Sequence, residues 1–251
     1  CIRDRSEIVS NKSCENVYRH NVFEQCSGAL TLRHGHRCVV DSNVFWGRKK
    51  RGTGGVRIIG RGHRVTNNYF EGLRGDAERA AISMMNGIPN SPLHEYSPVR
   101  NALVAHNTFI DCKVSLEIGV GAGKKQPQAP ADCQVSFNVF RTDKWALSRI
   151  HSQPVRFQWT ANRKERGDSN HKDSFQIERL DLMLQRHSDG LLRPNSPTPL
   201  QTQHPSPLRQ DIDAADRQPL AVAGCDDPKT PPLLLPSPDN TGPSYAGRDQ
   251  R

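Results

Sequence analysis

Three side chains near the start of the sequence have the types and spacing that suit proton transfer and anion binding. Glu7 and Lys12 lie close together, and Arg33 follows Lys12 after 21 residues. Placed on neighbouring turns of a repeating coil, they would set one carboxylate beside two strongly basic groups. Such a cluster can exchange a proton and hold a negatively charged ligand, so we treat it as a candidate active site.

A repeat along the chain would provide such turns. In five places a hydrophobic residue stands three positions before an Asn, and a Phe stands two positions after it. The copies are Tyr18/Asn21/Phe23, Val40/Asn43/Phe45, Val65/Asn68/Phe70, Val104/Asn107/Phe109 and Val135/Asn138/Phe140. The Asn-to-Asn steps are 22, 25, 39 and 31 residues, and Asn162 follows 24 later with Trp159 in the hydrophobic place and no Phe. This spacing, with insertions in two turns, predicts a solenoid.

Short runs between the Asn motifs alternate with period two, are bounded by glycine and predict strands. These runs are Ala29–Leu32, Val56–Ile59, Ala81–Met84 and Ser115–Ile118. A leucine-rich repeat would need a Leu-x-x-Leu-x-Leu frame, which the sequence lacks. We therefore expect an all-β fold, a right-handed parallel β-helix with an irregular C-terminal tail. Its Asn side chains would form a hydrogen-bonded column at one corner, and its Phe rings would stack inside.

The same alternation predicts which way the side chains point. The inward set is Ile8, Leu30, Leu32, Val56, Ile58, Ile82, Met84, Leu116 and Ile118. The outward set is Glu7, Thr31, Arg33, Arg57, Ser83 and Glu117. Lys12, Arg33 and Arg57 follow one another at steps of 21 and 24 residues, so we expect a column of cations that would suit an extended acidic polymer. The alternative is a solvated basic face with no ligand.

The amino-acid composition narrows the classes of molecule that the protein could bind. Lys plus Arg number 35 against 26 Asp plus Glu, and the net charge of +9 favours an acidic polysaccharide or nucleic acid. Nucleic acid is disfavoured because the basic residues lack the interleaved aromatics that stack on bases. No apolar run reaches the roughly 18 residues of a membrane span, so we expect no membrane partner. The seven cysteines contain no Cys-x-x-Cys pair and indicate neither a zinc site nor a complete disulfide framework, so we expect them to be buried small residues.

Several stretches match the motifs of a known enzyme family. They are Glu-Ile-Val-Ser-Asn-Lys-Ser, Glu-Asn-Val-Tyr, Thr-Leu-Arg-His-Gly, Gly-Thr-Gly-Gly-Val-Arg-Ile-Ile-Gly and Ala-Ala-Ile-Ser-Met-Met-Asn-Gly-Ile-Pro-Asn-Ser-Pro. With these motifs the chain resembles the alginate lyase and chondroitinase B family, polysaccharide lyase family six, densely from Glu7 to about Phe140. The resemblance implies a right-handed parallel β-helix that cleaves uronate-containing polysaccharides by β-elimination, usually with calcium in its groove.

The resemblance also implies roles for individual residues. Lys12 would be the base that takes the C5 proton of a uronate. Arg33 would stabilise the charge that develops or, in the family's proposed mechanism, protonate the leaving O4. A guanidinium holds its proton too firmly for Arg33 to be a convincing proton donor. Substrate carboxylates would be bound by His34, Arg57 and Arg79.

Calcium would take Glu7 as a ligand, but the chain departs from the family pattern here. The family carries a Glu-x-Glu pair ahead of the Lys motif and an Asn from an earlier coil. In this sequence Glu7 stands at the second Glu position, Arg5 stands at the first, and the earlier coil is not present. One carboxylate cannot hold calcium by itself. Because the sequence begins at Cys1, we expect an N-terminally truncated family member.

These observations give a division of the chain and two functional hypotheses. Residues 1–190 would form the β-helix lyase domain, and the Pro-rich residues 191–251 would pack along it or be partly disordered. The first hypothesis is a lyase that converts alginate, as poly-mannuronate, to 4,5-unsaturated products, with the glycosaminoglycan dermatan sulfate as the other candidate substrate. The second is a non-catalytic polyuronate-binding β-helix. By resemblance the protein would be secreted or periplasmic.

Overall fold

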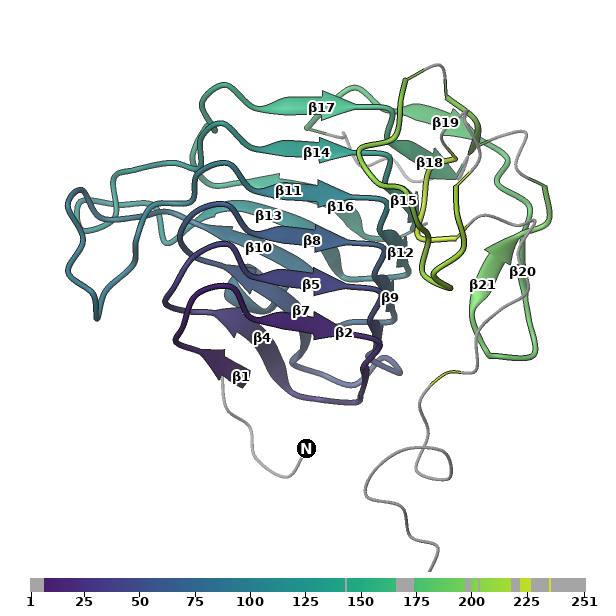
Figure 1. The fold of residues 1–251 in the computed structure, drawn as a ribbon, viewed down its shortest axis with the longest axis horizontal. Helices are drawn as coiled ribbons and strands as arrows, with labels where there is room; N and C mark the ends of the chain where they lie inside the picture. Colours follow the sequence, from purple (N-terminus) through teal and green to yellow (C-terminus); the bar gives the residue numbers. More distant parts are fainter. Residues whose placement is uncertain are drawn as a thin grey trace, which may run out of the picture.

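The structure is a computed structural model that describes residues 7–142, 144–165, 174–196, 200–202, 204–217, 222–226 and 235. Its strands stack into three parallel sheets, and each coil of the chain contributes one strand to each sheet (Figure 1). Within the described residues the one helical element is a 3-10 turn, η1 (Ala77–Arg79). The prediction of a parallel β-helix is confirmed.

The first sheet carries the candidate active site. Its strands, in order, are β1 (Glu7–Asn11), β4 (Gly28–Leu32), β7 (Thr53–Ile58), β10 (Ile82–Met85), β13 (Val114–Val120) and β16 (Ala146–Ile150). The four strand-like runs predicted from the sequence overlap β4, β7, β10 and β13. Glycine-bounded alternation was therefore a reliable signal for this sheet.

The second and third sheets consist of shorter strands. The second contains β2 (Val17–Arg19), β5 (Val39–Asp41), β8 (Arg64–Thr66), β11 (Leu103–Ala105), β14 (Gln134–Ser136) and β17 (Gln158–Thr160). The third contains β3 (Val22–Glu24), β6 (Val44–Trp46), β9 (Tyr69–Glu71), β12 (Thr108–Ile110), β15 (Val139–Arg141), β18 (Arg163–Glu165) and β19 (Glu178–Leu180). Beyond them, β20 (Leu184–Arg186) and β21 (Leu192–Pro194) form an antiparallel pair.

The predicted Asn column is present between the second and third sheets. Each Nδ2 donates to the Oδ1 of the next Asn at 2.9–3.0 Å, through Asn21, Asn43, Asn68, Asn107, Asn138 and Asn162. The same Oδ1 atoms accept backbone N–H groups of the preceding coil. The column thus satisfies buried backbone donors at a corner where no strand neighbour is available.

The predicted Phe stack is also present. Phe23, Phe45, Phe70, Phe109 and Phe140 follow one another with ring centroids 4.7–5.0 Å apart, and Trp159 continues the stack at 6.0 Å. Trp159 pairs with Val135, as its place in the repeat predicted. These rings and the aliphatic residues of the first sheet form one continuous core inside the coil.

One inward assignment is wrong. A bulge between Glu7 and Val9 places Val9 opposite Leu30, so Val9 packs against the core where Ile8 was expected. The extra residue of the bulge shifts the alternation at the start of β1, which the sequence pattern does not mark.

The expected column of cations is also wrong in its register. Arg57 pairs with Thr31, two positions before Arg33, so Arg33 and Arg57 are diagonal neighbours on the outer face. Lys12 follows Asn11, which pairs with Leu32, so Lys12 does lie at the level of Arg33. Lys12 and Arg33 are therefore level on neighbouring coils, whereas Arg57 is offset from Arg33 by two residues along the strand direction.

The outer face of the first sheet is covered where the sequence predicted an exposed surface. Thr31, Ser83 and Glu117 are at most 1% exposed, and η1 contacts the strands β4, β10 and β13 that carry them. The backbone N–H of Ala77 in η1 donates to Glu117 Oε1 at 3.1 Å, and its carbonyl accepts from Ser83 Oγ. Ser83 and Glu117 therefore hold the 3-10 turn on the sheet.

The tail after β19 runs along the outside of the coils (Figure 1). Leu192 N donates to Tyr69 Oη, Cys225 N donates to Thr108 Oγ1, and Arg217 donates to Asn67 Oδ1. Most of residues 227–251 lie outside the described part of the chain.

Two further predictions concern the burial of the cysteines and the presence of a membrane-spanning segment. Among the described residues Cys38, Cys112, Cys133 and Cys225 are buried and free, whereas Cys14 is exposed and Cys26 is half-buried. No helix in the described ranges has the length and apolar character that crossing a membrane demands.

Candidate active site

Two arginines of successive coils meet at one carboxylate. Arg33 Nη1 lies 3.2 Å from Glu7 Oε1, and Arg57 Nη1 lies 3.9 Å from the same oxygen. The Arg57 side chain is only 7% exposed, whereas that of Arg33 is 31% exposed. The structure thus brings together three residues that the sequence singled out, with Arg33 nearer to solvent.

A tyrosine that the sequence reading missed joins these arginines. Tyr96 Oη accepts from Arg33 Nη1 at 3.3 Å and from Arg57 Nη2 at 3.0 Å. Both guanidinium carbons also lie 5.3–5.4 Å from the centroid of the tyrosine ring. Tyr96 comes from the long connection between β10 and β11, the coil with the 39-residue Asn step. That step was the one signal for an inserted loop, although it could not show where the loop folds.

These contacts keep Arg33 charged. Burial by itself would lower the pKa of Arg33, but the hydrogen bond to Tyr96 and the charge of Glu7 raise it above its ordinary value. Arg33 is therefore a permanent cation suited to binding a carboxylate or developing negative charge.

Lys12 and His34 line one open pocket of about 570 Å³. One wall comes from the turns after β1 and β4, and the other comes from the β10–β11 connection. The lining residues are Lys12, Ser13, Cys14, His34, Gly35, His36, Ser91, Pro92, Leu93, His94, Glu95 and Ser97. The pocket therefore lies between residues 12–36 and the inserted loop that also carries Tyr96.

Asn11 fixes the turn that presents Lys12. Its buried amide donates to the carbonyls of Ser13 and His34, at 2.9 and 3.0 Å. Its own carbonyl accepts the backbone N–H groups of Arg33 and His34. Asn11 therefore links the Lys12 turn to the Arg33 turn of the next coil.

His34 is surrounded mainly by cations. Burial lowers the pKa of His34 below its ordinary value, and the charges of Arg33 and Lys12 lower it further, against a small opposite effect of Glu7. A neutral imidazole at this place would contact a substrate by hydrogen bonding.

Arg79 lies away from this group. Its Nη1 lies beside Gly52, 3.6 Å from where a Cβ on that glycine would be. Gly52 accepts from the backbone of Gly28 at the amino end of β4, whereas Arg33 follows the carboxyl end. The structure does not bring Arg79 to Lys12, and its part in substrate binding stays a prediction.

Further polar residues lie on the same outer face, three coils beyond Arg33. The buried Glu117 of β13 shares a short hydrogen bond with His151 Nε2, and Arg149 Nη1 lies 3.5 Å from its Oε1. The sequence predicted that Glu117 points outward, but it assigned no role to His151 or Arg149.

The surroundings of Glu7 can be tested against calcium. In the part of the chain that the structure describes, Glu7 stands with two guanidinium groups and a phenol, and calcium requires several oxygen ligands. This donor set does not fit calcium, so none of the chemistry below passes through a metal.

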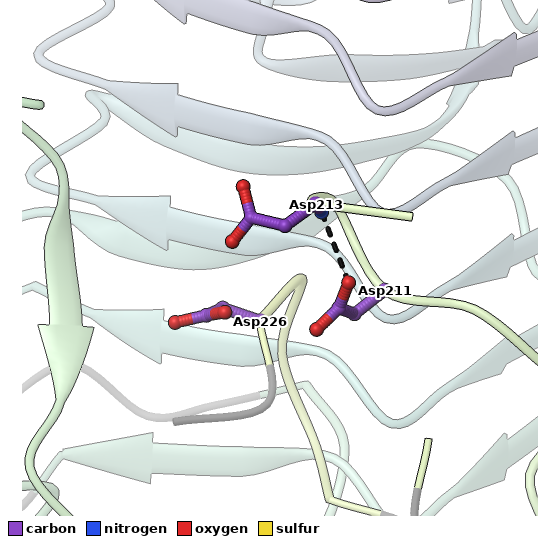
Figure 2. Close-up of side chains that lie close together, drawn as sticks. All are labelled: Asp211, Asp213 and Asp226. Atoms are coloured by element: carbon purple, nitrogen blue, oxygen red, sulfur yellow. Dashed lines mark hydrogen bonds between the residues drawn. The ribbon is translucent and has the colours of Figure 1, made fainter. Parts of the chain in front are cut away.

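A separate acidic cluster lies in the C-terminal tail. The carboxylates of Asp211, Asp213 and Asp226 are buried within 4.8 Å of one another (Figure 2). Arg193 Nη1 lies 2.6 Å from Asp213 and forms an ion pair of 2.8 Å with Asp226, and its Nη2 lies 2.6 Å from Asp189. A buried guanidinium therefore supplies positive charge to this cluster, which we interpret as a clamp that holds the tail together.

Comparison with known proteins gives consistent similarities. The family model described as Chondroitinase B matches residues 3–162. The solved PL6 family alginate lyase AlyGC is 35% identical over 77% of this chain and 26% of its own, with a TM-score of 0.73. A mannuronic acid specific polysaccharide family 6 lyase from human gut microbiota is 29% identical over 66% of this chain and 38% of its own, with a TM-score of 0.53.

A PL6 alginate lyase solved in complex with a trisaccharide is 24% identical, with a TM-score of 0.54 over 63% of this chain and 39% of its own, and supports the fold alone. No curated protein matches the chain. The chain spans about a quarter of the length of AlyGC, at 26%.

Proposed function

The chain belongs to polysaccharide lyase family six, the family of chondroitinase B and the alginate lyases, and from this we propose that it acts as a polysaccharide lyase on a uronate polymer. The observation that carries the proposal is the pocket holding Lys12 and His34 next to the paired cations Arg33 and Arg57. A base beside a carboxylate-binding pair is what β-elimination from a uronate requires.

The chemistry would proceed as follows. Lys12 Nζ, as the free amine, removes the proton at C5 of the uronate. The C5–H electrons form the C4–C5 double bond, the C4–O4 bond breaks, and O4 takes up a proton. The products are a 4,5-unsaturated uronate and a polymer end with a free hydroxyl group. Arg33 and Arg57 would bind the uronate carboxylate, where negative charge accumulates as the C5 proton leaves.

Alginate, as poly-mannuronate, is the substrate that we assign. Two of the similar structures are an alginate lyase and a mannuronic acid specific lyase, and these substrates support the assignment. The net charge of +9 fits any acidic polysaccharide, so dermatan sulfate is the comparison substrate. A secreted or periplasmic location remains a prediction from the family. Calcium with Glu7 as a ligand was also predicted from the family, but two guanidinium groups occupy that carboxylate in this chain.

The experiment is ultraviolet detection of unsaturated product. The protein is incubated with poly-mannuronate, poly-guluronate and dermatan sulfate, and Lys12→Ala is assayed beside it. We expect product from poly-mannuronate and none from Lys12→Ala. A folded chain that retains poly-mannuronate on an affinity gel but makes no product would instead be the non-catalytic binding β-helix.

A further inference from the structure

The proposed elimination leaves one chemical requirement open. When the C4–O4 bond breaks, O4 needs a proton, and a donor must stand near the departing oxygen. Lys12 gains a proton in the same reaction, and Arg33 holds its own too firmly to give it up. The groove therefore needs another side chain with an available O–H or N–H group.

Tyr96 has such a proton. A guanidinium has only N–H donors, so the hydrogen bonds from Arg33 and Arg57 both end on the phenol oxygen as acceptor. Neither bond uses the phenol's own hydrogen, and within the described residues no hydrogen bond donated by Tyr96 Oη is found. The O–H group is thus free to donate to a substrate oxygen.

Arg33 and Arg57 also stabilise the negative charge that forms on the Tyr96 oxygen after proton transfer. Once Tyr96 gives up its proton, its oxygen becomes an anion that already accepts two charge-assisted hydrogen bonds. Because those donors need not move, no reorganisation is required at the moment of reaction.

The tyrosine is held in position from both sides. Its ring packs against the small apolar cluster of Ile59, Met85 and Val120 on the outer face of the first sheet. Its carbonyl accepts from Ile88 N at 2.9 Å, which closes the inserted loop on itself.

The base of the loop is equally fixed. Gly87 exchanges two backbone hydrogen bonds with Gln128, and it packs so closely on Pro98 that a Cβ there would lie 2.3 Å from the Pro98 Cα. The middle of the loop is open to solvent at Pro89, Asn90 and residues 92–95, with Leu93 96% exposed. Glu95 and Ser97, on either side of Tyr96, line the pocket that contains Lys12. Tyr96 therefore stands on a braced segment at the wall of the groove.

We propose that Tyr96 is a further catalytic residue, the proton donor to the leaving O4. Lys12 takes the C5 proton, the C4–O4 bond breaks, and the Tyr96 O–H proton passes to O4, leaving a phenolate between Arg33 and Arg57. Solvent then returns a proton to Tyr96 and removes one from Lys12, so the enzyme is unchanged after each turnover. This inference rests on the proposed lyase function.

The test compares two substrates that differ in their leaving group. The first is a poly-mannuronate oligosaccharide, whose alkoxide leaving group needs a proton. The second is a mannuronate that carries 4-nitrophenoxide at C4, a group that departs without one. Wild type, Tyr96→Phe, Lys12→Ala and Arg33→Ala are assayed with both. Tyr96→Phe keeps the ring and removes only the hydroxyl.

We expect Tyr96→Phe to lower kcat on the oligosaccharide by about 100-fold or more with little change in KM, and by less than about threefold on the nitrophenyl substrate. Lys12→Ala should lose activity on both, because both lose the C5 proton. Arg33→Ala should also lose activity on both, because both carry the carboxylate.

Other patterns overturn the proposal. Equal losses of Tyr96→Phe on both substrates would make Tyr96 a positioning residue only, and full activity of Tyr96→Phe would give it no role. Recovery of Arg33→Ala on the nitrophenyl substrate would make Arg33 the donor. A wild-type chain inactive on both would reject the lyase function itself and the donor with it. Tyr69→Phe removes a hydroxyl on the third sheet that contacts Leu192 of the tail, and as a control it should keep the wild-type kcat.

Discussion

Arg33 and Glu7, 26 residues apart, form an ion pair of 3.2 Å across successive coils. The pair joins a residue expected to act on substrate with one expected to bind calcium. Because Arg57 also approaches the same carboxylate, Glu7 already compensates two cations. The role of Glu7 in this chain is therefore to hold the arginine pair together.

This arrangement predicts that calcium does not raise the thermal stability of the protein. We expect the same melting temperature in excess calcium and in excess chelator, since a metal would have to displace two guanidinium groups from Glu7. Thermal unfolding of wild type and Glu7→Gln measures this. A calcium-dependent rise that disappears in Glu7→Gln would show that Glu7 is a metal ligand after all.

Arg57 should be irreplaceable by lysine. Its buried fork contacts both Glu7 and Tyr96, which a single ammonium group cannot reproduce. We expect Arg57→Lys to lower kcat/KM on poly-mannuronate by about 100-fold, a loss typical of one missing charge-stabilising donor. Arg61→Ala, at an exposed arginine of the same coil, is the matched control and should stay near wild type. A fully active Arg57→Lys would contradict the geometry.

The Asn column should be strongest in its middle. Asn107 is buried, and its amide serves Asn68, Asn138 and the Val65 carbonyl. Asn107→Ala leaves buried groups without partners and should cost about 3 kcal/mol of unfolding free energy. Asn21 ends the column at an exposed position, so Asn21→Ala should cost less than about 1 kcal/mol. Chemical denaturation of both variants tests the difference, and equal costs would argue against a cooperative column.

His63 should make the fold acid-sensitive. Its Nε2 lies 2.9 Å from the Ile59 carbonyl and its Nδ1 accepts from Cys38 N, so the ring is buried in its neutral form. Burial lowers the pKa of His63 from 6.5 to about 4. Between these values the unfolded chain binds the extra proton, so stability should fall as pH drops from 6.5 towards 4. Melting curves across this range should be flatter for His63→Gln, and an unchanged slope would assign the effect to other groups.

Asp226 should give the stability of the fold the opposite pH dependence. Burial raises the pKa of Asp226 from 3.8 to about 7. Arg193 acts against this rise, and the charges of Asp213 and Asp211 add to it. The folded chain then holds a proton that the unfolded chain has lost, so stability should fall as pH rises from 3.8 to about 7. Asp226→Asn, which cannot ionise, should lose this decline. Limited proteolysis of the tail at both ends of the range gives a second readout, and identical digestion by pH and by variant would contradict the prediction.

The sequence by itself determined the elements that repeat. Asn and Phe recur at a fixed distance within each coil, and stacking parallel coils brings equal positions into contact. The column at Asn68 and Asn107, the stack at Phe70 and Phe109, and the level of Lys12 beside the next coil all follow from that step.

Only the tertiary structure decided the features that break the repeat. The bulge before Val9 and the pairing of Arg57 with Thr31 depend on hydrogen-bond register, which a period-two pattern leaves open. Tyr96 lies 63 residues from Arg33, on an inserted loop whose path is set by packing on the outer face of the sheet. Arg193 reaches Asp213 only after the tail has folded along the coils. Periodicity records contacts between equivalent positions, whereas these contacts join positions that have no equivalent in another coil.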